Sequence, residues 1–390
     1  MVPAAGDEVV DADGLAMIPG LVNGHTHAAM TLFRGYGNDL PLMEWLEQKI
    51  WPVEARLDAD DVYWGTRLAC VEMIRSGTVR FWDMYWQPAA VARAVDDSGL
   101  RASVGLPLID GMDPQRGRAV CAEAARALDD LGGCSPRVTP SLTPHGIYTV
   151  SEESLRWVAQ ESAARDLPVH LHFLETADEV TGCLERTGGV GPGAYLDRIG
   201  LLTDRVVLAH GCYLDDADLD LVAARGATIV TNPVSNLKLA VGRVFPLAAA
   251  RGRGIAVGLG TDGAASNNGL DLLQDVKFLA LVQKHGSGDP AACPAAEAWS
   301  IATGAAAPAL GQSGRLAVGE PADFLLVRGD APELTPGPLI DNLVYAAAGA
   351  VVDTTVVAGR VLMRSRELTF DEAEVRARAR ERVQALGLAP

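Results

Sequence analysis

The sequence predicts an α/β protein, a TIM-like (β/α)8 barrel beside a small accessory β-domain. Apolar runs rich in β-branched residues alternate eight times with longer helical patterns, which is typical of parallel βαβ units. Histidines and acidic residues stand at the carboxyl ends of several of these runs, where barrels of this class place their functional residues. The length of 390 residues suits such a barrel with an accessory piece. A doubly wound open sheet is disfavoured because no glycine-rich phosphate loop follows an early strand.

The strands that we expect in the barrel are short apolar runs. They cover residues 20–27, 78–85, 102–109, 138–145, 168–175, 206–211, 227–232 and 255–262. Two of the intervening helices have clear starts: Asp58 is a candidate N-cap before a helix that stops at Gly77, and Ser151 precedes an acidic first turn. Further helical patterns cover residues 215–225 and 270–284.

The chain divides into four expected regions. Residues 1–18 are a remnant of the accessory β-domain, 19–309 form the barrel, 310–365 form the accessory β-domain and 366–390 form a polar C-terminal helix. Ahead of the barrel, only residues 8–12 read as a short strand. The accessory sheet is therefore expected to be truncated at its N-terminal side, with exposed edges. Either a misplaced start or a subunit contact would account for those edges.

Composition limits the classes of partner. The chain has 33 Lys+Arg against 50 Asp+Glu, a formal net charge of −17, which argues against nucleic acid and anionic membranes as partners. The first residues lack a basic segment, and no apolar run reaches the roughly 18 residues of a membrane helix. The six cysteines are scattered without a Cys-x-x-Cys pair, which favours a reducing compartment. We therefore expect a cytoplasmic protein.

Residues 18–27 read as one apolar strand that ends in His25 and His27. Side chains alternate along a strand, so these two imidazoles point the same way and could supply half of a metal site. An isolated His-x-His pair is more often a pair of ordinary solvated or packed histidines. The other strand ends change this interpretation.

Four further strand ends carry a histidine or an acid. It is improbable that so many strand ends carry such residues by chance. They supply His145, then His172 with Glu175, then His210, and finally Asp262. Neutral imidazoles with one carboxylate are good ligands for zinc or another late first-row divalent ion. Strands 3 and 4 offer no lysine that could bridge a metal pair. We therefore expect one Zn2+ per chain, with Fe2+ or Mn2+ as alternatives, on His25, His27, His172 and Asp262, and we interpret His170 as a packed, hydrogen-bonded residue.

These residues lie within longer words that resemble a known family. The words are PGLVNGHTH (19–27), DLPLMEWL (39–46), IWPVE (50–54), HFLET (172–176), LAH (208–210), NPVSNLKL (232–239) and GLGTDGAASNN (258–268). They are similar to the amidohydrolase superfamily, and within its ATZ/TRZ subgroup to the 5′-methylthioadenosine/S-adenosylhomocysteine deaminases. The resemblance covers residues 15 to 365. It implies hydrolytic deamination of an adenosine-type nucleoside (5′-methylthioadenosine, adenosine, 5′-deoxyadenosine or S-adenosylhomocysteine) to the inosine analogue plus ammonia.

The resemblance also implies a role for each site residue. Zinc would lie on His25, His27, His172 and Asp262, and a divalent metal lowers the pKa of its water towards about 7, which suits attack on purine C6. Glu175 would contact the base and carry a proton to the ring nitrogen. Asp262 would pass a proton to the departing amine, and His210 would stabilise the new oxygen. Glu54 and His145 would hold the rest of the nucleoside. Apart from the resemblance, Trp86 could stack on the base or fill the barrel wall.

One departure bears on the substrate. The family often has an arginine near the end of strand 3, suited to the amino-acid carboxylate of S-adenosylhomocysteine, and by position this residue is Leu106 here. Arg116 or Arg118 on the following loop could compensate. The alternatives are a deaminase or hydrolase of another aminated heterocycle, such as guanine, a pterin or a triazine, and a non-catalytic structural relative. We expect a small-molecule nucleoside as partner and a homo-oligomer, a dimer or tetramer.

Overall fold

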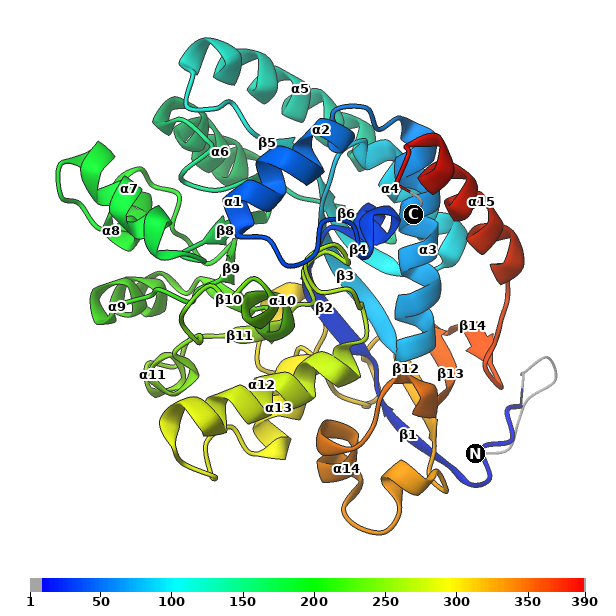
Figure 1. Cartoon of the computed structure of the whole chain (residues 1–390). Coiled ribbons are helices and arrows are strands. Elements are labelled where there is room, and N and C mark those ends of the chain that lie inside the picture. Colours follow the sequence, from blue (N-terminus) through cyan, green and yellow to red (C-terminus); the bar gives the residue numbers. More distant parts are fainter. Residues whose placement is uncertain (1–8, 389–390) are drawn as a thin grey trace.

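The computed structural model describes residues 9–388, and helices surround a barrel of parallel strands in its larger part (Figure 1). Two four-stranded parallel sheets form the barrel wall, with the orders β2-β3-β4-β6 and β8-β9-β10-β11. The wall strands are β2 (Leu21–Thr26), β3 (Thr78–Met84), β4 (Arg101–Gly105), β6 (Val138–Pro140), β8 (Val169–Phe173), β9 (Val206–His210), β10 (Thr228–Thr231) and β11 (Val257–Leu259).

Hydrogen bonds join the two sheets at both seams. On one side, β5 (Pro107–Leu108) and β7 (Thr143–Pro144) prolong the wall, and single bridges connect Leu142 to Val169 and Gly146 to His172. On the other side, the Asp262 N–H donates to the carbonyl of His25 at 3.0 Å. The wall is thus a closed eight-membered ring, and the predicted (β/α)8 class is confirmed.

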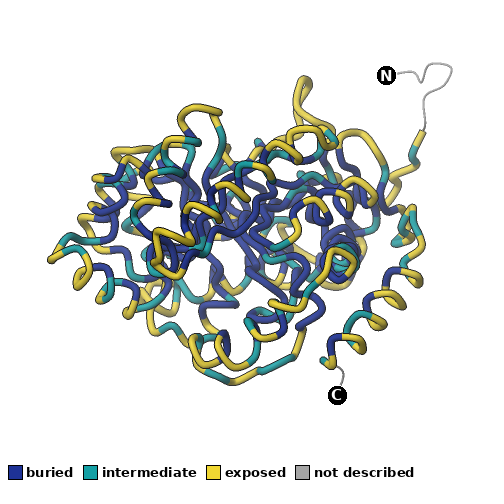
Figure 2. Tube along the Cα trace, turned by 90° about the horizontal axis from the view of Figure 1, so that it is seen from above, coloured by how far each residue is buried: buried dark blue, intermediate teal, exposed yellow. Residues whose placement is uncertain are grey.

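The helices cover the outside of the wall, and burial is concentrated inside the ring of helices (Figure 2). The predicted helix starts are confirmed: the Asp58 carboxylate accepts from the N–H groups of Asp60 and Asp61, and Ser151 caps the helix that follows it. No helix in the described part of the chain combines the length and apolarity needed to cross a membrane. The outer helices are α3 (Ala59–Ser76), α4 (Pro88–Ser98), α5 (Pro114–Gly132), α6 (Glu152–Arg165), α7 (Ala177–Thr187), α8 (Pro192–Arg198), α9 (Asp216–Arg225), α11 (Leu247–Gly252), α12 (Leu272–Ser287) and α13 (Ala295–Ala302).

The accessory domain is an antiparallel sheet with the order β1-β12-β13-β14-β15. Its strands are β1 (Leu15–Pro19), β12 (Phe324–Arg328), β13 (Val352–Val357), β14 (Arg360–Arg364) and β15 (Glu367–Leu368), followed by α15 (Glu372–Ala385) against α3. The strand expected at residues 8–12 is displaced: residue 8 lies outside the described residues, 9–12 form no strand, and the pairing begins at Leu15. The division into four regions stays a prediction.

The interpretation of residues 18–27 as one strand was wrong. The chain passes from the accessory sheet to the barrel at Gly20, between β1 and β2, and the Gly20 N–H donates to the carbonyl of Asp323 at 3.3 Å. A Cβ atom at this position would overlap both methyl groups of Val79 on the neighbouring barrel strand. The Val79 side chain therefore leaves room only for glycine at the point where the chain passes from one sheet to the other.

We predict that Gly20→Ala lowers the free energy of unfolding by about 1–3 kcal/mol, the usual cost of forcing a methyl group into a packed interior. Urea unfolding followed by circular dichroism measures the change. Gly132→Ala is the matched control, because nothing lies within 4 Å of the added methyl group and the position is helical. Adding Val79→Ala to Gly20→Ala should recover part of the loss, whereas equal effects at positions 20 and 132 would contradict the packing argument.

Candidate metal centre and active site

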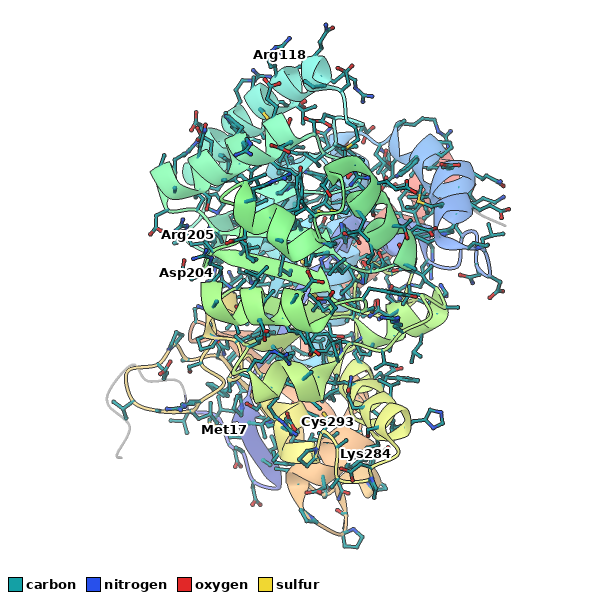
Figure 3. All side chains as sticks on the ribbon, turned by 90° about the vertical axis from the view of Figure 1, so that its left-hand side faces the viewer. Met17, Arg118, Asp204, Arg205, Lys284 and Cys293 are labelled. Carbon is teal, nitrogen blue, oxygen red and sulfur yellow. The ribbon has the colours of Figure 1, made fainter. Side chains whose placement is uncertain are left out.

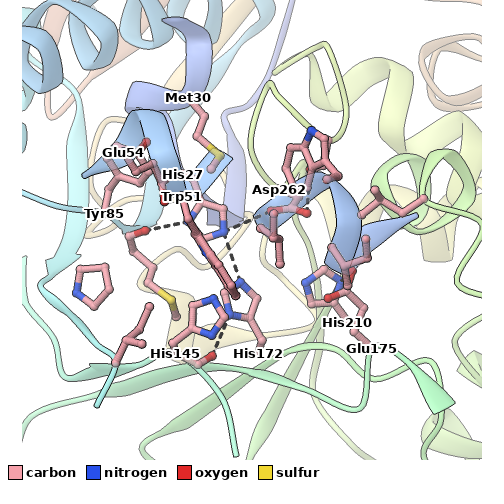
Figure 4. A pocket seen from close by; sticks show the side chains of 18 of the residues that line it. His27, Met30, Trp51, Glu54, Tyr85, His145, His172, Glu175, His210 and Asp262 are labelled. Atoms are coloured by element: carbon pink, nitrogen blue, oxygen red, sulfur yellow. Dashed lines mark hydrogen bonds and ion pairs between the residues drawn. The ribbon is translucent and has the colours of Figure 1, made fainter. Parts of the chain in front are cut away.

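Four side chains converge at the carboxyl end of the barrel, and Figure 4 shows three of them, His27, His172 and Asp262. His25 and His27, at and just after the end of β2, each place their Nε2 atom 3.4 Å from Oδ1 of Asp262. The Nε2 atom of His27 lies 3.2 Å from the Nε2 atom of His172 on β8. The ends of β2 and β8 and the segment after β11 thus bring three imidazoles and one carboxylate to a single point.

The hydrogen bonds on the far side of each ring fix which nitrogen faces this point. The Nδ1 atom of His27 lies 2.7 Å from the carbonyl of Met84, and that of His172 lies 2.7 Å from the carbonyl of His145. A carbonyl can only accept, so each Nδ1 carries the proton and each Nε2 presents a lone pair. Nδ1 of His25 lies 2.8 Å from Nε2 of His170, which confirms the interpretation of His170 as a packed, hydrogen-bonded residue.

The charge states suit a divalent cation. Burial lowers the pKa of His25 to about 4 and that of His172 well below its usual range, so both rings are neutral at pH 7. Burial acts to raise the pKa of Asp262, but the adjacent His25 holds it well below its ordinary value. Nε2 of His25 is buried with no hydrogen-bond partner among the described residues. Three imidazoles, two of them neutral at pH 7, and a carboxylate form a donor set that fits zinc.

Three residues at or just after the carboxyl ends of barrel strands have left-handed backbone conformations. Leu174, His210 and Asp262 follow or end their strands in the left-handed region, with φ of 55°, 77° and 63°. Such conformations cost on the order of 1–3 kcal/mol each for residues with a side chain and cluster at functional sites. The carboxylate of Asp262 is held in turn by the Gly263 N–H at 2.8 Å and by the Ser266 hydroxyl at 2.9 Å.

A buried acid and a fourth imidazole lie beside the four donors. Oε1 of Glu175 is 3.7 Å from Nδ1 of His210, and the Glu175 N–H donates to Glu179 at 3.0 Å. Burial raises the pKa of Glu175. Burial acts to lower the pKa of His210, but the nearby carboxylates of Glu175 and Asp262 raise it above its usual value. Two groups able to hold and pass on protons therefore border the donor cluster.

A pocket opens next to these groups, under a roof made by residues 42–54. The roof consists of α1 (Leu42–Trp45), the π-helix η2 (Leu46–Ile50) and α2 (Trp51–Glu54), and π-turns are frequent at functional sites. No lysine or arginine occurs among the described residues that line the pocket. Apart from the donors, Glu175 and His210, its walls are formed by Met30, Leu42, Trp45, Leu46, Trp51, Glu54, Met84, Tyr85, Trp86, Pro107, Ile109, His145, Tyr148, Leu239 and Ser266.

Three of the predicted substrate contacts line this pocket: Glu54, His145 and Trp86. Burial raises the pKa of Glu54 and lowers that of His145 to about 3, so His145 is neutral at pH 7. The roof residues Trp45 and Trp51 escaped the sequence analysis as site residues, although both lie in words that carried the family resemblance.

Two predicted contacts lie elsewhere. Side chains alternate along the chain from β4 to β5, so Pro107 and Ile109 line the pocket while Leu106 faces a separate surface hollow towards α4 and α5. Arg118 is exposed on α5, where it points outward (Figure 3), and its guanidinium lies 3.8 Å from Glu153. Leu106 and Arg118 are therefore removed from the set of pocket residues.

Comparisons with known proteins agree with this geometry. The model of the amidohydrolase family matches residues 16–362. A 5′-deoxyadenosine deaminase of Methanoregula boonei is 47% identical over 367 residues, which cover 93% of this chain and 83% of that protein. A 5-methylthioadenosine/S-adenosylhomocysteine deaminase of Pelotomaculum thermopropionicum is 43% identical, covering 97% of this chain and 87% of that protein.

Solved structures show the same fold. An adenosine deaminase from Xanthomonas campestris with bound zinc superposes with a TM-score of 0.90 at 36% identity, covering 96% of this chain and 87% of that one. The guanine deaminase of E. coli superposes with a TM-score of 0.81 at 22% identity, covering 90% of this chain and 85% of that one. At that identity the second likeness concerns the fold alone.

We predict that the purified protein holds about one zinc per chain and that His172→Ala loses it, because three imidazoles and one carboxylate make a single four-donor site. Elemental analysis of both proteins measures the metal directly. His285→Ala is the matched control, since His285 is exposed on α12 and far from the donors in sequence and structure. Two tightly held metals per chain, or a full complement in His172→Ala, would contradict the assignment.

Proposed function

This chain belongs to the amidohydrolase family of metal-dependent hydrolases, and we propose that it hydrolytically deaminates adenosine-type nucleosides. The observation that carries the proposal is a single pocket that brings together a metal donor set, a buried acid and the predicted nucleoside contacts Glu54 and His145. The products are the inosine analogue and ammonia. An absorbance assay that follows conversion of the adenine ring to the hypoxanthine ring tests it.

Zinc is the cofactor that fits, and His25, His27, His172 and Asp262 would hold it. When bound, zinc supplies Lewis acidity and lowers the pKa of water, so that a strong nucleophile is available at neutral pH. The His27 and His172 rings keep their Nε2 lone pairs in place through the Met84 and His145 carbonyls. These second contacts make the donor set rigid before any metal arrives.

Glu175 supplies the proton that the purine ring needs. Addition of water at C6 raises electron density on the adjacent ring nitrogen, and a carboxyl group in contact with that atom can donate a proton to it. Burial favours the protonated form of Glu175, which is the form that can donate. The position of Glu175 beside the donor cluster suits this task.

His210 and Asp262 handle the remaining charges. The raised pKa of His210 favours the protonated ring, a hydrogen-bond donor that stabilises the oxygen added at C6. Asp262 remains ionised and can accept a proton from the attacking water and pass it to the departing amine. Ammonia then leaves, the second proton of the added water returns to Glu175 as the C6 carbonyl forms, and the 6-oxopurine remains.

The far side of the pocket favours a nucleoside over a bare base. The Glu54 carboxylate can accept hydrogen bonds from ribose hydroxyl groups, and neutral His145 can contribute another. Guanine, a pterin or a triazine has no ribose and needs no such contacts. Deamination of one of these aminated rings is therefore only the second candidate function. Parallel assays on guanine and adenosine discriminate between these two functions.

The 5′ end of the nucleoside would meet apolar walls. Met30, Leu42, Trp45 and Leu46 line the pocket, and no lysine or arginine does so among the described residues. S-adenosylhomocysteine carries a carboxylate that needs a cationic or amide partner. Hydrogen, methyl and methylthio substituents need none, so we infer that small apolar 5′ groups are preferred.

The predicted cytoplasmic location, the homo-oligomeric state and the absence of nucleic acid as a partner stay predictions. A small-molecule substrate follows from the relatives named above. Size-exclusion chromatography with light scattering measures the oligomeric state directly.

We predict that Glu175→Gln lowers kcat by on the order of 10²-fold or more, the usual scale for losing a general acid–base group. Metal content and thermal unfolding should stay unchanged, because the amide matches the carboxyl group in size and Glu175 is outside the donor set. Steady-state kinetics and elemental analysis on one preparation check both statements. A near-normal kcat in Glu175→Gln would move the proton donor elsewhere, with His145 as the next candidate.

We predict that kcat/KM for 5′-deoxyadenosine, 5′-methylthioadenosine or adenosine exceeds that for S-adenosylhomocysteine by at least about tenfold, because an unpaired polar group costs about 1–3 kcal/mol to bury. Ile109→Arg should narrow the gap by adding a cation to the pocket wall. Leu106→Arg is the matched control, since Leu106 lies outside the pocket, and should leave the ratio unchanged. Equal turnover of S-adenosylhomocysteine by the unmodified enzyme would contradict the preference.

A further inference from the structure

We propose that Ser235 and Asn236, two consecutive residues of α10 (Pro233–Lys238), are positioning residues that fix Asp262 and His210 for the reaction. This inference rests on the proposed function, and it gives a chemical task to the word NPVSNLKL, which otherwise only marks the family. The short helix α10 follows strand β10, which lies between the strands that end at His210 and lead to Asp262.

Each residue holds one neighbour. The Ser235 hydroxyl donates to Oδ2 of Asp262 at 2.7 Å, and Oδ1 of Asn236 accepts from Nδ1 of His210 at 2.8 Å. Both side chains are buried. Consecutive residues of a helix project about 100° apart, so one turn can reach the strand on either side of β10.

The contact with Asn236 determines the tautomer of neutral His210. An amide oxygen can only accept, so Nδ1 of His210 carries the proton and Nε2 is left unprotonated or becomes the second donor when the ring is charged. Nε2 is buried with no partner among the described residues. Asn236 thus keeps Nε2 of His210 available for the reacting atoms. An amide side chain does so without a change in its own protonation.

The contact with Ser235 determines the orientation of the Asp262 carboxylate. Oδ2 accepts from the hydroxyls of Ser235 and Ser266, while Oδ1 accepts from the Gly263 N–H and lies 3.4 Å from His25 and His27. Ser266 and Gly263 belong to the loop that carries Asp262 itself. Ser235 belongs to α10, which follows a different strand, β10, and ties that loop to the rest of the barrel.

The helix is itself held by Lys238. Its ammonium group donates to Oδ1 of Asn38 at 3.0 Å, to the carbonyl of Ala265 at 3.0 Å and to the side chain of Asn268. A helix of six residues is marginal without such contacts. Lys238 connects it both to the segment before the pocket roof and to the loop after β11, so α10 moves with the site that it supports.

Asn236→Ala should lower kcat for 5′-deoxyadenosine by about 10- to 100-fold, change KM by less than threefold and leave the zinc content unchanged. Asn236→Asp keeps an acceptor for the His210 proton and should recover at least tenfold of a 100-fold loss. Leu237→Ala is the matched control on the same helix, because Leu237 is 46% exposed and contacts neither His210 nor Asp262 in any hydrogen bond. A normal kcat in Asn236→Ala would overturn the role of Asn236.

A spectroscopic measurement separates this inference from the proposed function. In zinc-loaded protein labelled with 15N-histidine, the ring signals of His210 are identified by their loss in His210→Asn. At a pH where the His210 ring is neutral, wild-type protein should show the proton on Nδ1, and Asn236→Ala should lose that preference, whichever substrate the enzyme uses. A wild-type signal for a neutral ring protonated at Nε2 would overturn the proposal even if Asn236→Ala does not fold.

Ser235 is tested through metal retention. Ser235→Ala should weaken zinc binding in chelator competition by about tenfold, the lower end of the usual effect of losing a contact behind a metal ligand. Ser235→Thr keeps the hydroxyl group and should restore the affinity. Equal zinc affinity in wild-type protein and Ser235→Ala would show that the hydroxyl does not orient Asp262.

Discussion

Three imidazole lone pairs and one carboxylate face each other at the mouth of this barrel, and much of the surrounding structure keeps them there. Nitrogen lone pairs 3.2 Å apart repel unless a cation lies between them, so rings free to rotate would turn away. The carbonyls of Met84 and His145 prevent this by accepting a hydrogen bond from the Nδ1–H group on the far side of each ring. The barrel pays for this arrangement with buried, desolvated donors and strained backbone at Leu174, His210 and Asp262.

Two of the residues with strained backbone are also residues whose side chains are held by buried hydrogen bonds. His210 and Asp262 have left-handed backbone conformations at or just after strand ends, and both side chains line the pocket. For His210 and Asp262 the restraint comes from α10, the helix that follows β10, the strand between β9 and β11. The parallel order of the wall strands makes this possible, because it brings the ends of β9, β10 and β11 to the same edge.

The sequence alone was sufficient for the donors and insufficient for much of the pocket. His25, His27, His172 and Asp262 could be found because strand periodicity and strand ends are local signals. Leu106 was misplaced because the face of a side chain depends on register, and a shift of one residue past Pro107 exchanges the two faces. The break at Gly20 was missed because it depends on a distant partner, Val79, and the tryptophans of the roof lie in a segment with no strong period.

Charge offers a last consistency between sequence and site. The chain carries a formal net charge of −17, so its long-range field repels anions, and the described residues that line the pocket include no lysine or arginine to oppose it. An adenosine-type nucleoside is uncharged at neutral pH, so neither the negative charge of the chain nor the lack of a lysine or arginine in the pocket opposes its entry. Binding must then come from apolar walls and a few directed hydrogen bonds, which is the composition of this pocket. Glu54 can accept hydrogen bonds from the hydroxyl groups of an uncharged nucleoside. An anionic substrate would be repelled by Glu54 as well as by the net charge of the whole protein.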